Sequence, residues 1–236
     1  MTLETQPVAY GDEDARLNGF LAIDAVRRDR RPGILVVHGG AGLDDHARGR
    51  ARRFAEAGFV VFACDMYGEG VTGREAIVRH VMELRKDRER LRRRAQPAID
   101  ILLRHPQVDG RIAAVGYCFG GMTVLELARG GAALAGAVSV HGSLETPRPA
   151  DPSGVQSKIL VCHGALDPHV PMTQVATFAE EMKHAGVDYQ LNIFGSAMHG
   201  FTHETANGQQ PGVAYHAQTD RRSSAAIAAF LGEIFQ

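Results

Sequence analysis

The chain has 236 residues, of which 44% are hydrophobic and 22% charged, and its formal net charge is −1. This composition is typical of a soluble globular protein with a sizeable core, and the near-neutral charge favours neither nucleic acid nor an anionic membrane as a partner. The polar N-terminus predicts no signal peptide, and no apolar run approaches the ~18 residues of a membrane span. Three widely spaced cysteines fit a reducing, cytoplasmic location, and we expect Cys64 and Cys162, inside apolar segments, to lie in the core.

Apolar segments alternate with helix-like segments along the chain. Residues 5–10 and 16–24 predict an N-terminal hairpin. Further strands are predicted at residues 33–40, 59–66, 111–118, 134–142, 158–167 and 188–195. Helices are predicted at residues 44–58, 74–104, 121–130, 171–186 and 220–236. The last of these places four apolar side chains on one face, namely Ile227, Phe230, Leu231 and Ile234.

This alternation predicts an α/β fold. Continuous apolar strands between helices indicate a mainly parallel sheet of about eight strands with helices on both faces. We expect a single domain over residues 1–236 without a large cap domain. Residues 142–157 and 200–218 escape the pattern, and because both follow strands we expect them on the side where α/β proteins bind ligands.

The segment GYCFG, residues 116–120, lies between a predicted strand and a predicted helix, the context of a nucleophile elbow. Gly116 and Gly120 are small enough for the sharp turn that lifts a nucleophile above the sheet edge. A helix N-terminus favours the thiolate of Cys118, and the backbone N–H of Phe119 would stabilise an oxyanion. A buried, inert cysteine fits the same turn equally well.

A catalytic thiol needs a histidine as base, and chain order separates the candidates. Four of the eleven histidines precede glycine at a strand end: His38, His141, His163 and His199. In this arrangement the nucleophile comes first, then an acid, then the histidine. His38 precedes the cysteine, His141 lies on the next strand, and His163 precedes the best acid, Asp167. His199 lies after the last strand, where the base belongs, although Asp167 before proline is also a common turn starter.

Other segments allow both a functional and a structural interpretation. The Gly-rich loop at residues 38–46 offers the N–H of Gly40 as a second oxyanion donor, and no dinucleotide or P-loop motif is present. We expect Tyr67, Tyr117, Phe119, Met198 and Phe201 to line either a substrate pocket or the core, and His203 to face the pocket or solvent.

The basic run at residues 85–94 is interleaved with Asp87 and Glu89. On a helix these acids are neighbours of Arg90 and Arg93, respectively. A solvated helix face is the favoured interpretation, and a site for an anionic substrate or partner is the alternative.

The chain resembles the dienelactone hydrolase family of the α/β-hydrolase superfamily. The matching segments are HGGAGLDDH (38–46), CDMYGEG (64–70), GYCFGG (116–121), HGALDPHVP (163–171) and GSAMHGF (195–201). The resemblance implies an α/β-hydrolase fold, Cys118 as nucleophile, His199 as general base and Asp167 as its orienting acid. It also implies hydrolysis of small-molecule lactones or activated esters through an acyl-thioester, without a metal or cofactor.

Two positions depart from the family pattern. Gly39 stands where the well-studied members carry a glutamate near the resting nucleophile, and His203 stands where they carry an arginine for the substrate carboxylate. Both point away from dienelactone itself as the substrate. The remaining alternatives are an esterase or thioesterase of other specificity and a non-catalytic, redox-sensing protein of the same fold. We expect a monomer or weak dimer.

Overall fold

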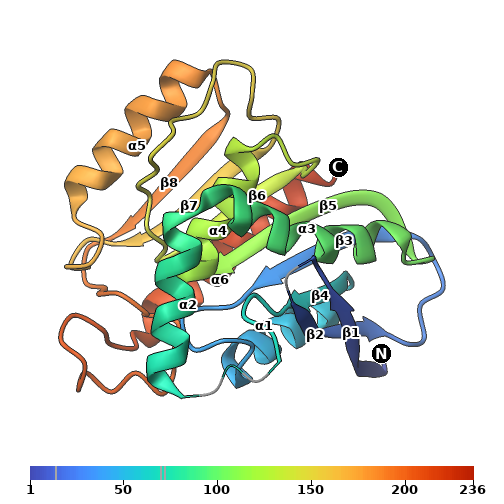
Figure 1. The fold of residues 1–236 in the computed structure, drawn as a ribbon. Coiled ribbons are helices and arrows are strands. Elements are labelled where there is room, and N and C mark those ends of the chain that lie inside the picture. The colour runs from blue at the N-terminus through green and yellow to red at the C-terminus, as the bar shows by residue number, and fades with distance from the viewer. Residues whose placement is uncertain (14, 70, 72) are drawn as a thin grey trace. The chain divides into compact units, whose positions relative to one another are not determined.

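The computed structural model describes residues 1–236 except 14, 70 and 72. One residue of the predicted hairpin turn and the last residue of the segment CDMYGEG therefore lie outside the described residues. Within the described part, eight strands and six helices follow one another along the chain (Figure 1). The strands are β1 (Leu3–Gly11), β2 (Arg16–Asp24), β3 (Arg31–Val37), β4 (Val60–Cys64), β5 (Val108–Tyr117), β6 (Gly136–Val140), β7 (Lys158–Gly164) and β8 (Tyr189–Phe194). The helices are α1 (Asp45–Glu56), α2 (Arg74–Lys86), α3 (Arg88–Arg104), α4 (Phe119–Arg129), α5 (Met172–Ala185) and α6 (Ala217–Ile234).

The strands form an eight-stranded sheet in the order β1-β2-β4-β3-β5-β6-β7-β8. Pairing is antiparallel between β1 and β2 and between β2 and β4. It is parallel between β3 and β4, between β6 and β7, and between β7 and β8. A mainly parallel sheet with helices confirms the predicted fold class. No helix among the described residues is long and apolar enough to cross a membrane.

The chain divides into two compact units, Met1–Val115 and Gly116–Gln236. In the first unit the residues of β4 are all buried, and α1 and α3 pack against this strand. Helix α1 begins after Asp44, whose carboxylate accepts a hydrogen bond from the N–H of Ala47. This cap satisfies one of the free backbone donors at the helix start and explains the position of the boundary.

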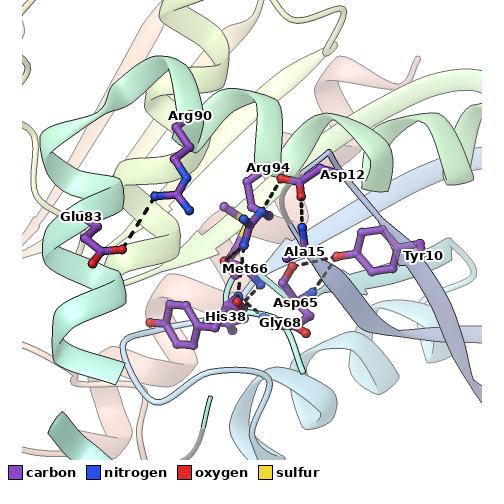
Figure 2. A network of polar contacts seen from close by, with 11 residues as sticks. Tyr10, Asp12, Ala15, His38, Asp65, Met66, Gly68, Glu83, Arg90 and Arg94 are labelled. Atoms are coloured by element: carbon purple, nitrogen blue, oxygen red, sulfur yellow. Dashed lines mark hydrogen bonds and ion pairs between the residues drawn. The ribbon is translucent and has the colours of Figure 1, made fainter. Parts of the chain in front are cut away.

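The prediction of a single helix over residues 74–104 is wrong, because the structure has two helices that are separated at Asp87. This residue has extended backbone (φ −109°, ψ 90°), and its carboxylate accepts the N–H of Arg90 at 2.9 Å. An aspartate in this role starts a new helix. The Arg90 guanidinium instead lies 3.7 Å from the carboxylate of Glu83, so it pairs across the break (Figure 2).

In the second unit, α4 packs on β6, and α6 packs on β6 and β7. Ile227, Phe230 and Leu231 are buried, as the pattern of α6 predicts. Helix α5 ends at Gly186, whose φ of 69° is the left-handed conformation that glycine adopts without strain. The candidate catalytic residues follow the strands of this region: Cys118 comes after β5, Asp167 after β7 and His199 after β8.

Candidate active site

The turn between β5 and α4 has the backbone strain expected of a nucleophile elbow. Cys118 joins the two elements with φ 53° and ψ −112°, a conformation that residues with a side chain rarely adopt. A Cβ atom at Gly116 would lie 2.0 Å from the carbonyl oxygen of Gly120. The turn therefore requires glycine at position 116, for the reason inferred from the sequence. Cys118 itself is partly exposed.

Three side chains form a row of polar contacts at this turn. The Nε2 atom of His199 lies 3.1 Å from Sγ of Cys118, and its Nδ1 atom lies 2.8 Å from Oδ2 of Asp167. Oδ1 of Asp167 accepts the backbone N–H groups of His169 at 2.8 Å and Val170 at 3.2 Å. The aspartate thus starts the turn and also holds the imidazole, so the two interpretations of Asp167 do not exclude each other. The structure brings together the nucleophile, base and acid predicted from the sequence, and their catalytic roles remain a prediction.

His199 and Asp167 each change the pKa of the other. Burial alone lowers the pKa of His199, but hydrogen bonds and negative charge from Asp167 and Cys118 outweigh it and raise that pKa to about 10. Burial raises the pKa of Asp167, yet the hydrogen bond and charge of His199 and the two backbone N–H groups lower it overall. A protonated imidazole beside Sγ favours the thiolate form of a cysteine.

The segment that carries His199 is held by backbone hydrogen bonds on both sides of the residue. The N–H of His199 donates to Gly212 at 3.0 Å, and its carbonyl accepts from Ala214 at 3.1 Å. Farther along, the N–H of His216 donates to the carbonyl of Phe201 at 3.1 Å. These bonds fix the imidazole on a stretch without regular secondary structure.

Two buried residues, His141 and Thr202, lie beside the proposed nucleophile. The sequence indicates His141 only as a candidate base and does not indicate Thr202. His141 follows β6 with φ 42° and accepts the N–H of Cys118 on Nδ1 at 3.2 Å. Its Nε2 atom lies 2.8 Å from Oγ1 of Thr202. Chain order argues against His141 as the base, but that rule gives no information about supporting residues. The only signal was the His-Gly pair at a strand end.

His163 and His169 lie around the same row. The ring of His169 lies 5.3 Å from that of His199. His163 is 1% exposed, and neither ring nitrogen has a hydrogen-bond partner among the described residues. Burial and the neighbouring charge of His199 lower the pKa of His163, against the opposing effect of Asp167. His163 is therefore a neutral core side chain.

The predicted pocket residues of the second unit differ in their exposure. Tyr117 and Phe201 are buried, and the ring of Phe201 packs edge-on against His141 at 5.0 Å. Met198 is 39% exposed. His203 is partly exposed, with its ring 5.8 Å from that of His141. A role of these side chains in substrate binding remains a prediction.

In the first unit, the Gly-rich loop is held by the side chains of His38 and Tyr67. The Nε2 atom of His38 accepts the N–H of Met66 at 3.1 Å, so its Nδ1 carries the proton and donates to the carbonyl of Gly39 at 2.6 Å (Figure 2 shows the first bond). The Tyr67 hydroxyl contacts the carbonyl oxygens of Gly39 and Gly40 at 3.4 and 3.1 Å. Because the peptide is trans, the N–H of Gly40 points away from the held carbonyl of Gly39.

The loop after β4 is held by polar side chains of the same unit. Arg94 is 2% exposed, forms an ion pair with Asp12 and donates to the carbonyls of Met66 and Tyr67 at 3.2 and 3.4 Å. Oδ1 of Asp65 accepts the N–H of Tyr67 at 2.9 Å. Figure 2 shows this network around the loop. Arg94 is thus the buried member of the basic run, whose other basic residues are exposed or partly exposed.

No group of three or more histidine, cysteine, aspartate or glutamate side chains in the described residues is arranged to hold a metal ion.

Comparison with known proteins identifies relatives over most of the chain. The dienelactone hydrolase family matches residues 17–235. A solved structure described as m3DLH is 36% identical, covers 100% of both chains and superposes with a TM-score of 0.95. A dienelactone hydrolase-like promiscuous phosphotriesterase from metagenomic libraries is 38% identical, with 100% coverage of both chains and a TM-score of 0.94.

A carboxymethylenebutenolidase homolog of Mus musculus is 26% identical over 56% of this chain, and the match spans only 54% of the mouse protein. The family match and the two full-length structural matches agree with the observed fold, a mainly parallel sheet with helices. The chain therefore belongs to the dienelactone hydrolase family, whose members are hydrolases of the α/β-hydrolase fold.

Proposed function

We propose that the chain is a cysteine-dependent hydrolase of lactones or activated carboxylic esters, with Cys118 as nucleophile, His199 as base and Asp167 as its orienting acid. The supporting observation is the continuous row of contacts from Asp167 through His199 to Sγ of Cys118, which stands on a strained turn at the start of α4. A buried, inert cysteine needs neither the histidine nor the positive φ.

The proposed reaction begins from a thiolate paired with protonated His199. The thiolate attacks the carbonyl carbon, and the electrons of the C=O bond move to the oxygen. The N–H groups of Phe119 and Gly40, predicted from the sequence, are the proposed donors to this oxyanion. The intermediate collapses, and the leaving alkoxide takes the proton from Nε2 of His199, which leaves an acyl-thioester and a neutral imidazole.

The second half of the reaction releases the acid. Neutral His199 removes a proton from water at Nε2 while the water oxygen attacks the thioester carbonyl. The second oxyanion collapses and expels the thiolate, so the resting pair is restored. Asp167 fixes the tautomer throughout, because Nδ1–H of His199 donates to its carboxylate.

A thiolate is a better leaving group than an alkoxide, and this limits the substrate class. Attack on an unactivated ester tends to revert, because the intermediate expels the thiolate first. Strained lactones and esters with a good leaving group are therefore the proposed substrates. The mechanism needs a reduced thiol, which suits the cytoplasmic location predicted from the cysteines.

Gly39 and His203 replace the glutamate and arginine expected from the family pattern, so we propose substrates other than dienelactone. A phosphotriester belongs among the compounds to be tested, because one full-length relative is described as a promiscuous phosphotriesterase. A panel of lactones with and without a carboxylate tests the replacement of the arginine by His203.

The test is turnover of p-nitrophenyl acetate by the wild type and by C118A, H199A and D167A, with mass spectrometry to trap an acyl-enzyme. We expect each variant to lose activity by about 100-fold or more, and the acyl group to sit on Cys118. Cys162→Ala is the matched control, because burial raises the pKa of that thiol to about 12 and keeps it unreactive. Full activity in C118A would contradict the proposal.

The same experiment separates the alternatives. Acylation by simple esters or thioesters but by no lactone identifies an esterase or thioesterase. If no acyl compound modifies the wild type while mild peroxide oxidises Cys118, the protein is a redox sensor rather than a hydrolase. The prediction of a monomer or weak dimer is tested by light scattering of the same preparations.

A further inference from the structure

A buried pair of side chains, His141 and Thr202, lies between the turn at Cys118 and the segment that carries His199. His141 has no exposed surface and Thr202 is 1% exposed. They come from different segments of the chain: His141 follows β6, and Thr202 lies three residues after His199. We propose that they are positioning residues that keep the nucleophile and its base in register, an inference that rests on the proposed function.

The hydrogen bonds fix the protonation of His141. The N–H of Cys118 is shared between the carbonyl of Val140 at 3.0 Å and Nδ1 of His141 at 3.2 Å. Because Nδ1 accepts, the proton of His141 is on Nε2, which donates to Oγ1 of Thr202 at 2.8 Å. A doubly protonated ring would place a second N–H against that of Cys118. His141 is thus held neutral and in one tautomer by the nucleophile's own amide.

Ring packing extends the link to the base itself. The ring of His141 lies edge-on to that of His199, with centroids 5.3 Å apart, and edge-on to Phe201 at 5.0 Å. It therefore limits how far the imidazole of His199 can tilt away from Sγ. One side chain contacts the backbone of the nucleophile, the ring of the base and the hydroxyl of Thr202.

The backbone at position 141 supports a role beyond packing. Its φ of 42° is unfavourable for most residues with a side chain, and histidine is among those that tolerate it best. This conformation accompanies the hydrogen bond from Nδ1 to the turn at Cys118. A side chain that only filled space would need neither the strained backbone nor two directed hydrogen bonds.

The effect on the reaction follows from the 3.1 Å distance between Nε2 of His199 and Sγ of Cys118. If the link is removed, the base drifts relative to the thiol and the ion pair is populated less. A misplacement of about 1 Å lowers the rate of a positioned reaction by about 100-fold. Substrate contacts are unchanged, so kcat should fall and KM should stay.

The experiment measures alkylation of Cys118 by iodoacetamide as a function of pH, together with kcat and KM for p-nitrophenyl acetate. His141→Leu removes both hydrogen bonds, and we expect alkylation at neutral pH and kcat to fall about 10- to 100-fold. His141→Asn keeps an acceptor near the position of Nδ1 and tolerates the positive φ. It should recover part of the lost rate.

Thr202→Val tests the other end of the link without changing the size of the side chain, and Thr202→Ser should recover most of what valine loses. We expect Thr202→Val to lower the alkylation rate by about 3- to 10-fold and to shift the pH profile of alkylation upward. Thr219→Val is the matched control, because Thr219 is also 1% exposed and its Oγ1 lies 2.8 Å from Nδ1 of His216. It should cost stability without changing the alkylation profile.

The proposal would be overturned if Thr202→Val and His141→Asn both fold and both keep the alkylation profile and kcat of the wild type. It would also be overturned if these variants raise KM while kcat stays constant. If His141→Leu fails to fold, Thr202→Val alone decides. If the proposed hydrolase function is wrong instead, the wild type forms no acyl-enzyme. In that case the variants still differ from the wild type in their alkylation rates.

Discussion

The surroundings of Cys118 and His199 set them apart from the other cysteines and histidines of the chain. The chain has three cysteines, and burial raises the pKa of Cys64 and of Cys162, so their thiols stay protonated. Cys118 differs because it is partly exposed and lies beside an imidazole whose pKa is raised to about 10. These surroundings favour Cys118 over the other two cysteines as the proposed nucleophile.

The contact between Nε2 of His199 and Sγ of Cys118 predicts how His199 titrates. Both Cys118 and Asp167 raise the pKa of His199. Cys118→Ala removes the contribution of the thiolate, so the pKa of His199 should fall from about 10 toward its ordinary value of 6.5. Titration of the imidazole signals by nuclear magnetic resonance measures this in the wild type and in the variant. An unchanged pKa would show that Asp167 alone holds the proton.

At the scale of the element, the β5–α4 turn depends on glycine at position 116. Gly116→Ala would place a methyl group 2.0 Å from the carbonyl oxygen of Gly120, so backbone must move. We expect the free energy of unfolding to fall by about 1–3 kcal/mol and kcat to fall with it, because the displaced turn carries Cys118, the proposed nucleophile. Urea denaturation and ester turnover measure the two effects.

Gly232 provides the control for this substitution. It lies in α6, and a Cβ there meets no atom within 4 Å. Gly232→Ala should therefore stabilise the protein by about 0.5–1 kcal/mol and leave turnover unchanged. Equal effects of the two alanines on stability and turnover would show that the turn tolerates a side chain.

The elements and the three aligned side chains were predictable from the sequence because each has a local signal. Apolar runs, helix caps and glycines define the strands, helices and turn, and chain order selects Asp167 and His199 among competing residues. The break at Asp87 was missed because helical periodicity continues on both sides of it, and only the capping bond to Arg90 shows the new helix start. The link from His141 to Thr202 joins residues 61 positions apart and leaves no local pattern.

The loop after β4 depends on a charge that the sequence pattern assigned to a solvated face. Arg94 is 2% exposed and pairs with Asp12, whose side chain is 11% exposed. Asp12→Ala leaves this guanidinium buried without its carboxylate, and we expect the free energy of unfolding to fall by about 3–5 kcal/mol. Asp151→Ala is the control, since its ion pair with Arg148 is largely exposed and contributes about 0–1 kcal/mol. If Asp12→Ala and Asp151→Ala lower the free energy of unfolding equally in urea denaturation, Arg94 is exposed to solvent rather than buried.

At the scale of the whole molecule, each compact unit encloses a histidine whose pKa is lowered by burial. His38 in the first unit has no exposed surface, and His163 in the second is 1% exposed. Burial lowers the pKa of both below the ordinary value of 6.5. Below that pH the unfolded chain binds protons that the folded chain does not, so stability falls as the solution becomes more acidic.

This acid sensitivity can be tested at His163, because neither of its ring nitrogens has a hydrogen-bond partner among the described residues. His163→Leu removes the titrating group without breaking a hydrogen bond, so the variant should be at least as stable as the wild type at neutral pH. As the pH falls below the ordinary value of 6.5, the wild type should lose stability faster than the variant, by at most about 1.4 kcal/mol per pH unit, since one proton separates them. Urea denaturation across this range measures the slope, with His184→Leu as control because the ring of His184 is exposed on α5. Parallel slopes for the wild type and His163→Leu would mean that His163 gains its proton in the folded protein.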